Sequence, residues 1–207
     1  MTEPVHYRVP RSRGRFEIVI SKSRFIATAD NVSGIAATKA FLAEVRAEMP
    51  GASHHVYAFR VGFGNTVQEG MSDDGEPSGT AGPPVLAIIR GSGIGDIMIV
   101  VTRYFGGTKL GTGGLVRAYS EAARGVLSEL PTEEKIPRCV FGIEVPYSLF
   151  TQVKRVLVSY EATVLDEVFA ADIAMIASIP RSSFGELAIQ LADLSNGKVV
   201  PVIMEED

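Results

Sequence analysis

The sequence predicts an α+β protein of two domains, because β-rich runs and helical periodicities interleave in both of its halves. Its 207 residues exceed the size of one small domain. Hydrophobic residues make up 46% and charged residues 21% of the chain, which is ordinary for a globular protein with a sizeable core. Two prolines and a charged cluster follow a long helical pattern at 130–137. We therefore expect a first domain at 1–131, a linker at 132–137 and a second domain at 138–207.

The second domain carries the clearer pattern of elements. Strands are expected at 138–146, 163–170, 172–179 and 198–204, and helices at 147–159 and 184–194. Gly197 is suited to end the second of these helices. The order βαββαβ is that of a ferredoxin-like sandwich of two layers.

The first domain is more irregular. Strands are expected at 16–20, 24–29, 54–61 and 97–103, helices at 33–49, 85–89 and 113–130, and a polar, glycine-rich loop at 62–84. Ser33 offers an N-cap for the first helix. The run at 97–103 is apolar almost throughout, which is typical of a strand buried on both faces.

Composition and charge narrow the possible functions. Cys139 is the only cysteine, which excludes an internal disulfide and a zinc site built from cysteines. No apolar run reaches the ~20 residues of a membrane helix, and the first 15 residues lack the hydrophobic centre of a secretion signal. We therefore expect a cytoplasmic protein without a membrane partner.

The net charge of −4 is unevenly distributed. Residues 1–131 contain 14 Lys+Arg against 12 Asp+Glu, whereas residues 132–207 contain 6 against 12. A polyanion would therefore bind the first domain.

The most informative segment is residues 100–119, where an apolar strand runs into a glycine-crowded loop and then into a helix. Glycines allow a ligand to approach the backbone, and the N–H groups at a helix start attract anions. Arg103, Lys109 and Arg117 add positive charge, and Tyr104 could stack on a base. The expected phosphate-binding backbone comprises Gly106, Gly107, Gly111, Thr112, Gly113 and Gly114. The spacing matches neither the Walker nor the Rossmann pattern, and a tight turn without a ligand is the alternative.

A second loop, at residues 71–84, contains three carboxylates and three hydroxyl groups. Asp73, Asp74 and Glu76 could gather a cation such as Mg²⁺, since hard cations prefer oxygen ligands. Alternatively, the loop is a solvated turn in which Thr80 caps the next helix and the aspartates bond their own backbone. The hydroxyl groups of Ser72, Ser78 and Thr80 are further candidate ligands.

His54 and His55 are adjacent on a predicted strand, so their side chains point to opposite faces and at most one of them faces the site. His55 is the candidate for ligand binding. A hydrogen-bonded structural histidine is the alternative.

Together, Ser72–Gly82 and Val100–Tyr119 closely resemble the signature of the IMPACT family of YigZ-like proteins. The resemblance extends to Ser23–Ala27 and His55–Arg60, and covers roughly residues 15–130. The remainder looks like the ferredoxin-like second domain of bacterial members.

This resemblance implies a first domain like the fourth domain of elongation factor G, a two-layer α/β sandwich with a left-handed βαβ crossover. Eukaryotic members of the family regulate translation. We therefore predict a translation-associated protein that binds RNA, ribosome-associated nucleic acid or another phosphate-bearing ligand and needs no cofactor. The rival hypothesis is a phosphotransferase or hydrolase with Mg²⁺ on the three carboxylates, acting on a nucleotide or small phosphorylated substrate, with His55 assisting.

Overall fold

The computed structural model describes residues 7–62 and 67–206. The chain divides into two compact units, Met1–Lys135 and Ile136–Asp207, which we call unit 1 and unit 2. Across the described residues, no helix combines the length and the apolar character needed to cross a bilayer.

Unit 1 is built on a five-stranded antiparallel sheet with strand order β2-β3-β6-β4-β5. Its strands are β2 (Gly14–Ile20), β3 (Ser23–Asn31), β4 (His54–Val61), β5 (Gln68–Ser72) and β6 (Ile97–Tyr104). β6 occupies the centre and is buried along almost its whole length, as its continuous apolar sequence predicts.

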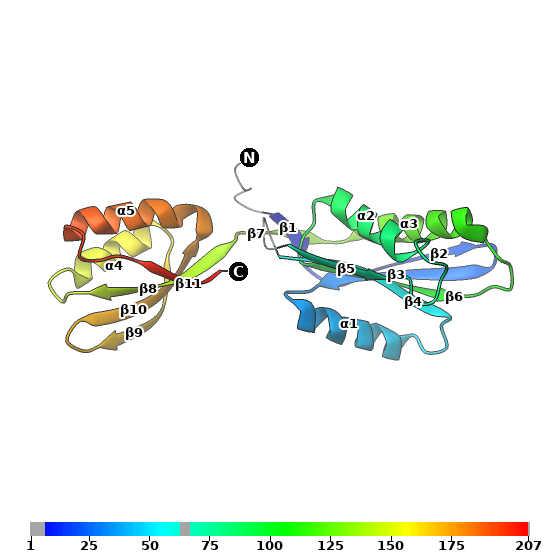
Figure 1. Cartoon of the computed structure of the whole chain (residues 1–207), viewed down its shortest axis with the longest axis horizontal. Helices are drawn as coiled ribbons and strands as arrows, with labels where there is room; N and C mark the ends of the chain where they lie inside the picture. Colours follow the sequence, from blue (N-terminus) through cyan, green and yellow to red (C-terminus); the bar gives the residue numbers. More distant parts are fainter. Residues whose placement is uncertain (1–6, 63–66, 207) are drawn as a thin grey trace. The chain divides into compact units, whose positions relative to one another are not determined.

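Helices cover both faces of this sheet (Figure 1). α2 (Gly82–Ser92) and α3 (Gly111–Glu129) lie on one face, and α1 (Ile35–Glu48) lies on the other. Side chains alternate accordingly along β3, where Phe25 and Ala27 pack toward α2 and α3, and Ile26 packs toward α1. The sheet with α2 and α3 forms the two predicted layers, and α1 adds a third layer on the other face of the sheet. The N-cap residue of α1 is Gly34 and not the predicted Ser33.

Two crossover connections define the chirality of unit 1. β3 and β4 are parallel to each other and joined through α1, and β5 and β6 are parallel to each other and joined through α2. If the sheet is rotated by 180° about the normal to its plane, the β5–α2–β6 connection runs in the same direction as the β3–α1–β4 connection. The helices of the two connections nevertheless lie on opposite faces of the sheet. The two crossovers therefore have opposite hands, and one is left-handed, against the usual preference.

The predicted linker at 132–137 is wrong for its first four residues. Thr132–Lys135 forms β7, which pairs antiparallel with β1 (Tyr7–Pro10). The buried carboxylate of Asp96 accepts hydrogen bonds from Tyr7 Oη at 2.6 Å and Lys135 Nζ at 2.9 Å. This carboxylate therefore joins both strands to the body of unit 1.

Besides β7, two further strands of unit 1 were absent from the prediction. One is β1, and the other is β5, which lies inside the predicted loop at 62–84, of which residues 63–66 fall outside the described part. β5 is polar and contains Gly70, so it carries no apolar alternation that would indicate a strand.

Unit 2 has the predicted βαββαβ order. It comprises β8 (Arg138–Val145), α4 (Phe150–Ser159), β9 (Thr163–Phe169), β10 (Ile173–Pro180), a short 3-10 turn (Arg181–Ser183), α5 (Phe184–Ser195) and β11 (Val202–Glu206). The antiparallel strand order β11-β8-β10-β9 is that of the ferredoxin-like sandwich. Cys139 is buried in its core, and Gly197 follows α5 with a φ of 78°.

Candidate functional site

A pocket of about 330 Å³ lies at the start of α3 in unit 1. It combines a cationic rim, apolar walls and a buried ion pair, and is lined by Glu76, Pro77, Arg103, Phe105, Lys109, Leu110, Gly111, Thr112 and Leu115. The two loops that the sequence singled out therefore meet here, at Glu76–Pro77 and at 103–112.

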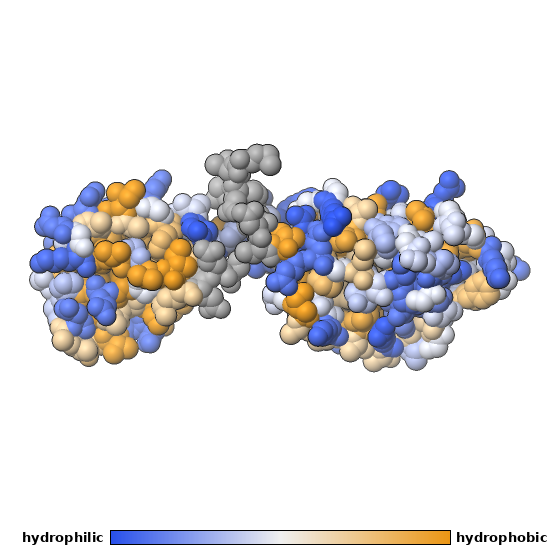
Figure 2. All heavy atoms as spheres, in the orientation of Figure 1, coloured by the Kyte–Doolittle hydropathy of each residue, from blue (hydrophilic) through white to orange (hydrophobic). Residues whose placement is uncertain are grey.

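Unit 2 has a larger hollow of about 470 Å³ on its sheet, which contains none of the predicted site residues. Val202 and Met204 line it and are exposed, and Figure 2 shows hydrophobic residues among hydrophilic ones on the visible surface. The pocket of unit 1 is the better candidate because residues of both predicted loops line it.

The first turn of α3 offers backbone donors to solvent. The helix begins at Gly111, and Gly111, Thr112 and Gly113 are exposed. Within the described residues, no side chain caps this helix and its first turn contains no acidic residue. The first N–H groups of a helix have no intrahelical partner, so these amides remain available to an anion.

Lys109 and Arg117 are exposed next to this turn, as a phosphate site requires. Arg103 was predicted to share that role, but it is buried whereas Lys109 and Arg117 are exposed. Its side chain is 6% exposed and its Nη1 donates to Glu76 Oε1 at 2.6 Å. The charge of Arg103 is therefore balanced inside the protein.

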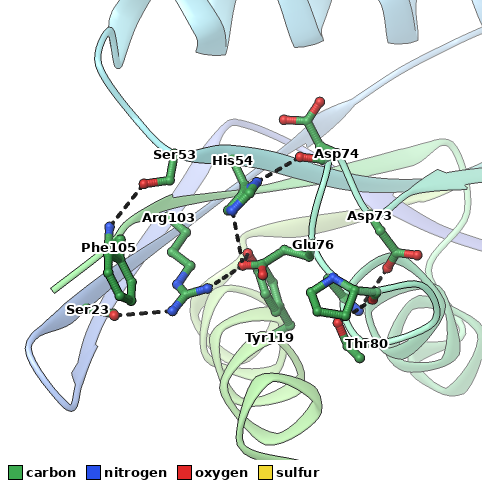
Figure 3. Close-up of polar contacts among 12 residues, drawn as sticks. Ser23, Ser53, His54, Asp73, Asp74, Glu76, Thr80, Arg103, Phe105 and Tyr119 are labelled. Carbon is green, nitrogen blue, oxygen red and sulfur yellow. Dashed lines mark hydrogen bonds and ion pairs between the residues drawn. The ribbon is translucent and has the colours of Figure 1, made fainter. Parts of the chain in front are cut away.

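Glu76 is the centre of a buried polar cluster under the pocket (Figure 3). Its Oε1 accepts hydrogen bonds from Arg103 and, at 2.7 Å, from the Tyr119 hydroxyl of α3, and lies 3.8 Å from His54 Nε2. Burial, followed by the hydrogen bond to Glu76, raises the pKa of Tyr119 far above its ordinary value. Tyr119 therefore stays protonated and donates to the carboxylate.

Two aromatic rings flank the Arg103 guanidinium. Its Cζ lies 5.3 Å from the Phe25 ring centroid and 5.4 Å from that of Phe105. Nη2 lies 3.4 Å from Ser23 Oγ, whereas Nε has no acceptor among the described residues. Phe105 is 49% exposed, so one aromatic side chain of this stack is open to solvent.

Gly106 holds the loop against the turn between β2 and β3. A Cβ built on Gly106 would lie 2.0 Å from the backbone carbonyl carbon of Lys22, so only glycine fits. Its N–H donates to Ser23 Oγ at 3.1 Å, and this amide is therefore not free to bind phosphate. The same contact brings the exposed Lys22 beside the loop, whereas Gly107 is exposed to solvent.

Hydrogen bonds to backbone groups hold the acidic loop in place. They favour the interpretation of this loop as a turn over its interpretation as a metal site. Asp73 accepts N–H bonds from Gly79, Ala81 and Gly82 at 2.8–2.9 Å, so it caps α2. Burial raises the pKa of Asp73, but these three bonds outweigh it and the pKa is lowered overall. Thr80, predicted to be this cap, instead donates its hydroxyl hydrogen to Pro77 O at 2.6 Å.

Asp74 points to the other face of the sheet. Its carboxylate accepts hydrogen bonds from Arg46 of α1 at 2.9 Å and from the His55 N–H at 2.6 Å. The N–H of Asp74 donates to Ser72 Oγ at 3.1 Å, so the hydroxyl group of Ser72, a predicted ligand, has a partner within the loop. The three carboxylates therefore accept hydrogen bonds from three different sets of donors. No three His, Cys, Asp or Glu side chains of the described residues gather to hold a metal ion, so the predicted site is not assembled.

His54, and not His55, faces the pocket side. His54 Nδ1 lies 2.8 Å from the carbonyl oxygen of Asp74, above Glu76 (Figure 3). His55 faces α1, where its Nδ1 lies 3.1 Å from Thr102 Oγ1 and burial lowers its pKa. His55, which was predicted to bind the ligand, therefore lies on the face of the sheet opposite the pocket.

Tyr104 also packs on the α1 side, with Arg24 over its ring at 5.5 Å. Tyr104 therefore does not line the pocket, whereas its neighbour Phe105 does. Of the remaining predicted residues, Gly114 is partly buried in the first turn of α3 and Ser78 is exposed in the acidic loop.

Sequence reasoning missed the pocket walls and several supporting residues. Phe105, Leu110 and Leu115 look like ordinary core residues, and Ser23 and Lys22 lie about 80 positions before the loop that they contact. The sequence signal for Ser23 was the family-like motif Ser23–Ala27, and Lys22 lies directly before that motif.

The fold and site define a class: a two-domain α+β protein with an uncapped, glycine-rich helix start above a buried Arg–Glu pair. The model of the Impact N-terminal domain matches residues 21–127, and one of a domain of unknown function matches residues 143–198. The chain belongs to the IMPACT family.

Similar proteins span nearly the whole chain. An IMPACT family member from Haemophilus influenzae is 38% identical over 200 residues, which covers 96% of this chain and 97% of that protein. IMPACT family member YigZ from Escherichia coli is 39% identical, with coverage of 90% and 92%. A crystal structure of a hypothetical protein aligns over 100% of both chains, with 36% identity and a TM-score of 0.76.

Proposed function

We propose that this protein is a cytoplasmic, translation-associated binding protein whose unit 1 holds RNA or another phosphate-bearing ligand at the start of α3. The observation that carries the proposal is the first turn of α3, which lacks a side-chain cap and an acidic residue and in which Gly111, Thr112 and Gly113 are exposed. Natural helix starts that lack a side-chain cap leave donors for water or for a ligand.

The phosphate lies against these amides and is neutralised by Lys109 and Arg117. The aligned peptide dipoles place roughly half a positive charge at the helix start. Arg117 follows Gly113 and Gly114 by four and three positions, so it lies on the same helix face. Lys22, which the sequence did not single out, adds a third exposed cation beside Gly106.

Binding without phosphoryl transfer is favoured by the state of the carboxylates. A Mg²⁺-dependent reaction needs oxygen ligands that converge on the phosphate. Here Asp73 caps α2, Asp74 pairs with Arg46 and Glu76 pairs with Arg103. With three cations at the site, affinity is modest and depends on salt.

The test is a salt titration of a fluorescently labelled RNA with the Lys109→Ala, Arg117→Ala double variant. We expect weaker binding, and a slope of log affinity against log salt that falls by about 0.7 for each lost contact to a single strand. The control is Lys39→Ala, Arg124→Ala, which removes the same charges at exposed positions on α1 and farther along α3. Equal slopes for both double variants would overturn the proposal.

A further inference from the structure

We propose that the pocket at the start of α3 takes an unpaired nucleobase, so that the site selects single-stranded over double-stranded RNA. This inference rests on the proposed function and adds to it the form of the RNA. A phosphate alone needs only the amides and cations, and the pocket beside them has features that a phosphate does not use.

The first of these features is the apolar lining. Pro77, Phe105, Leu110 and Leu115 contribute carbon surface to a volume of about 330 Å³. A flat, largely apolar ring gains from such walls, because burial of apolar area and stacking both favour it. A phosphate or another small anion gains nothing from them.

The second feature is Phe105 itself. The ring packs over the Arg103 guanidinium at 5.4 Å and is nevertheless 49% exposed. Single exposed apolar residues are common on protein surfaces, but this one stands at the mouth of a pocket with a charged floor. An aromatic ring held in this way offers a stacking surface to a base.

The third feature is the unpartnered Nε of Arg103, a side chain that is 6% exposed and lines the pocket. Nη1 and Nη2 contact Glu76 and Ser23, and the Nε hydrogen has no acceptor among the described residues. A buried donor without an acceptor is unfavourable. Because the Nε atom has less than 1 Å² of accessible surface, a carbonyl or ring nitrogen on a base edge reaches it only when the pocket floor shifts on binding.

The two binding surfaces are contiguous. Lys109, Gly111 and Thr112 line the pocket and also belong to the phosphate-binding turn. A nucleotide joins a base to a phosphate, so one nucleotide can occupy both surfaces. In a duplex the bases are paired and stacked, so only a single strand can place a base in the pocket while its phosphate contacts α3.

The experiment compares three labelled probes by fluorescence anisotropy: a short oligouridine strand, the same strand annealed to oligoadenosine, and a strand of equal length without bases. The inference predicts that the oligouridine strand binds about tenfold more tightly than the other two, as expected for one stacked base. Phe105→Ala should remove this preference and leave duplex affinity unchanged. Met71→Ala, a 47% exposed position on β5, is the control and should keep the preference.

Equal affinity for the three probes would overturn the inference while leaving phosphate binding in place. Displacement of the strand by a nucleoside monophosphate of equal affinity would also overturn it, because the occupant would then be a free nucleotide. Absence of binding to all three probes would overturn the proposed function together with the inference. Circular dichroism of each variant shows that it is folded.

Discussion

Two loops of unit 1 are rich in glycine and polar residues, yet their hydrogen-bonding groups are used in opposite ways. In the acidic loop at 72–82, Asp73 accepts three backbone N–H groups, and Asp74 and Glu76 pair with arginines. In the glycine loop at 105–114, the N–H of Gly106 is bonded to Ser23, whereas the first turn of α3 is uncapped. The first loop is therefore a support, and the second is the surface available to a ligand.

The comparison shows that residue type alone does not identify a binding loop. Three clustered carboxylates suggest a metal site, and three cations suggest a phosphate site, until the partner of each side chain is known. Glu76 and Arg103, one from each predicted site, neutralise each other at 2.6 Å. The groups without protein partners are the ones that can bind something else.

The largest effect on stability should come from breaking the ion pair between Glu76 and Arg103. Glu76→Ala leaves Arg103 as a buried cation without a counter-ion and should lower the free energy of unfolding by about 3–5 kcal/mol. Urea denaturation followed by circular dichroism measures it. Glu121→Ala, an exposed position on α3, is the control and should change stability by less than about 0.5 kcal/mol. A similar small change for both variants would show that Glu76 has no supporting role.

A smaller, pH-dependent effect should come from the acidic loop. Asp73→Ala removes the cap of α2 and should cost about 1–2 kcal/mol of stability at neutral pH. The folded-state pKa of Asp73 is lowered, so its contribution is complete above the unfolded pKa of about 3.9 and is lost as the pH falls through the folded value. Wild type and variant should therefore converge in thermal melts at low pH. A difference that stays constant from neutral to acidic pH would exclude this cap, and Ser78→Ala controls for the loop.

The smallest effect should come from Lys22, at the edge of the glycine loop. Lys22→Ala keeps the Cβ and the backbone conformation, so stability should be unchanged. The salt slope of RNA binding should fall by about 0.7, the value of one phosphate contact. A slope equal to that of the wild type would restrict the site to the start of α3.

Much of the fold could be predicted because its signals are local. The βαββαβ order of unit 2 follows from alternating and helical periodicities, and the step from β6 through the glycine loop to α3 follows from sequence alone. β5 and β7 could not be predicted in the same way. They are short and polar, and they exist because they pair with β4 and β1.

The sequence located the two loops that line the pocket, but it did not give the directions of their side chains. β6 is apolar on both faces, so its pattern does not tell which face Arg103 and Tyr104 point to. The same ambiguity applies to His54 and His55 on β4. Only the packing of α1 on one face and α3 on the other decides which member of each pair lies under the pocket.

The central claim is that the amides at the start of α3 form an open anion site, and Gly113→Glu tests it most directly. Nothing lies within 4 Å of a Cβ at Gly113, so the new side chain fits, and its carboxylate takes the place of the phosphate. A negative charge in the first helical turn should raise stability by about 0.3–1 kcal/mol. The uncharged Gly113→Gln variant has the same shape and is the control.

The account predicts that Gly113→Glu melts at or above the wild-type temperature while its RNA affinity falls several-fold, and that Gly113→Gln keeps most of the affinity. A folded Gly113→Glu variant that binds RNA as tightly as the wild type would contradict the account.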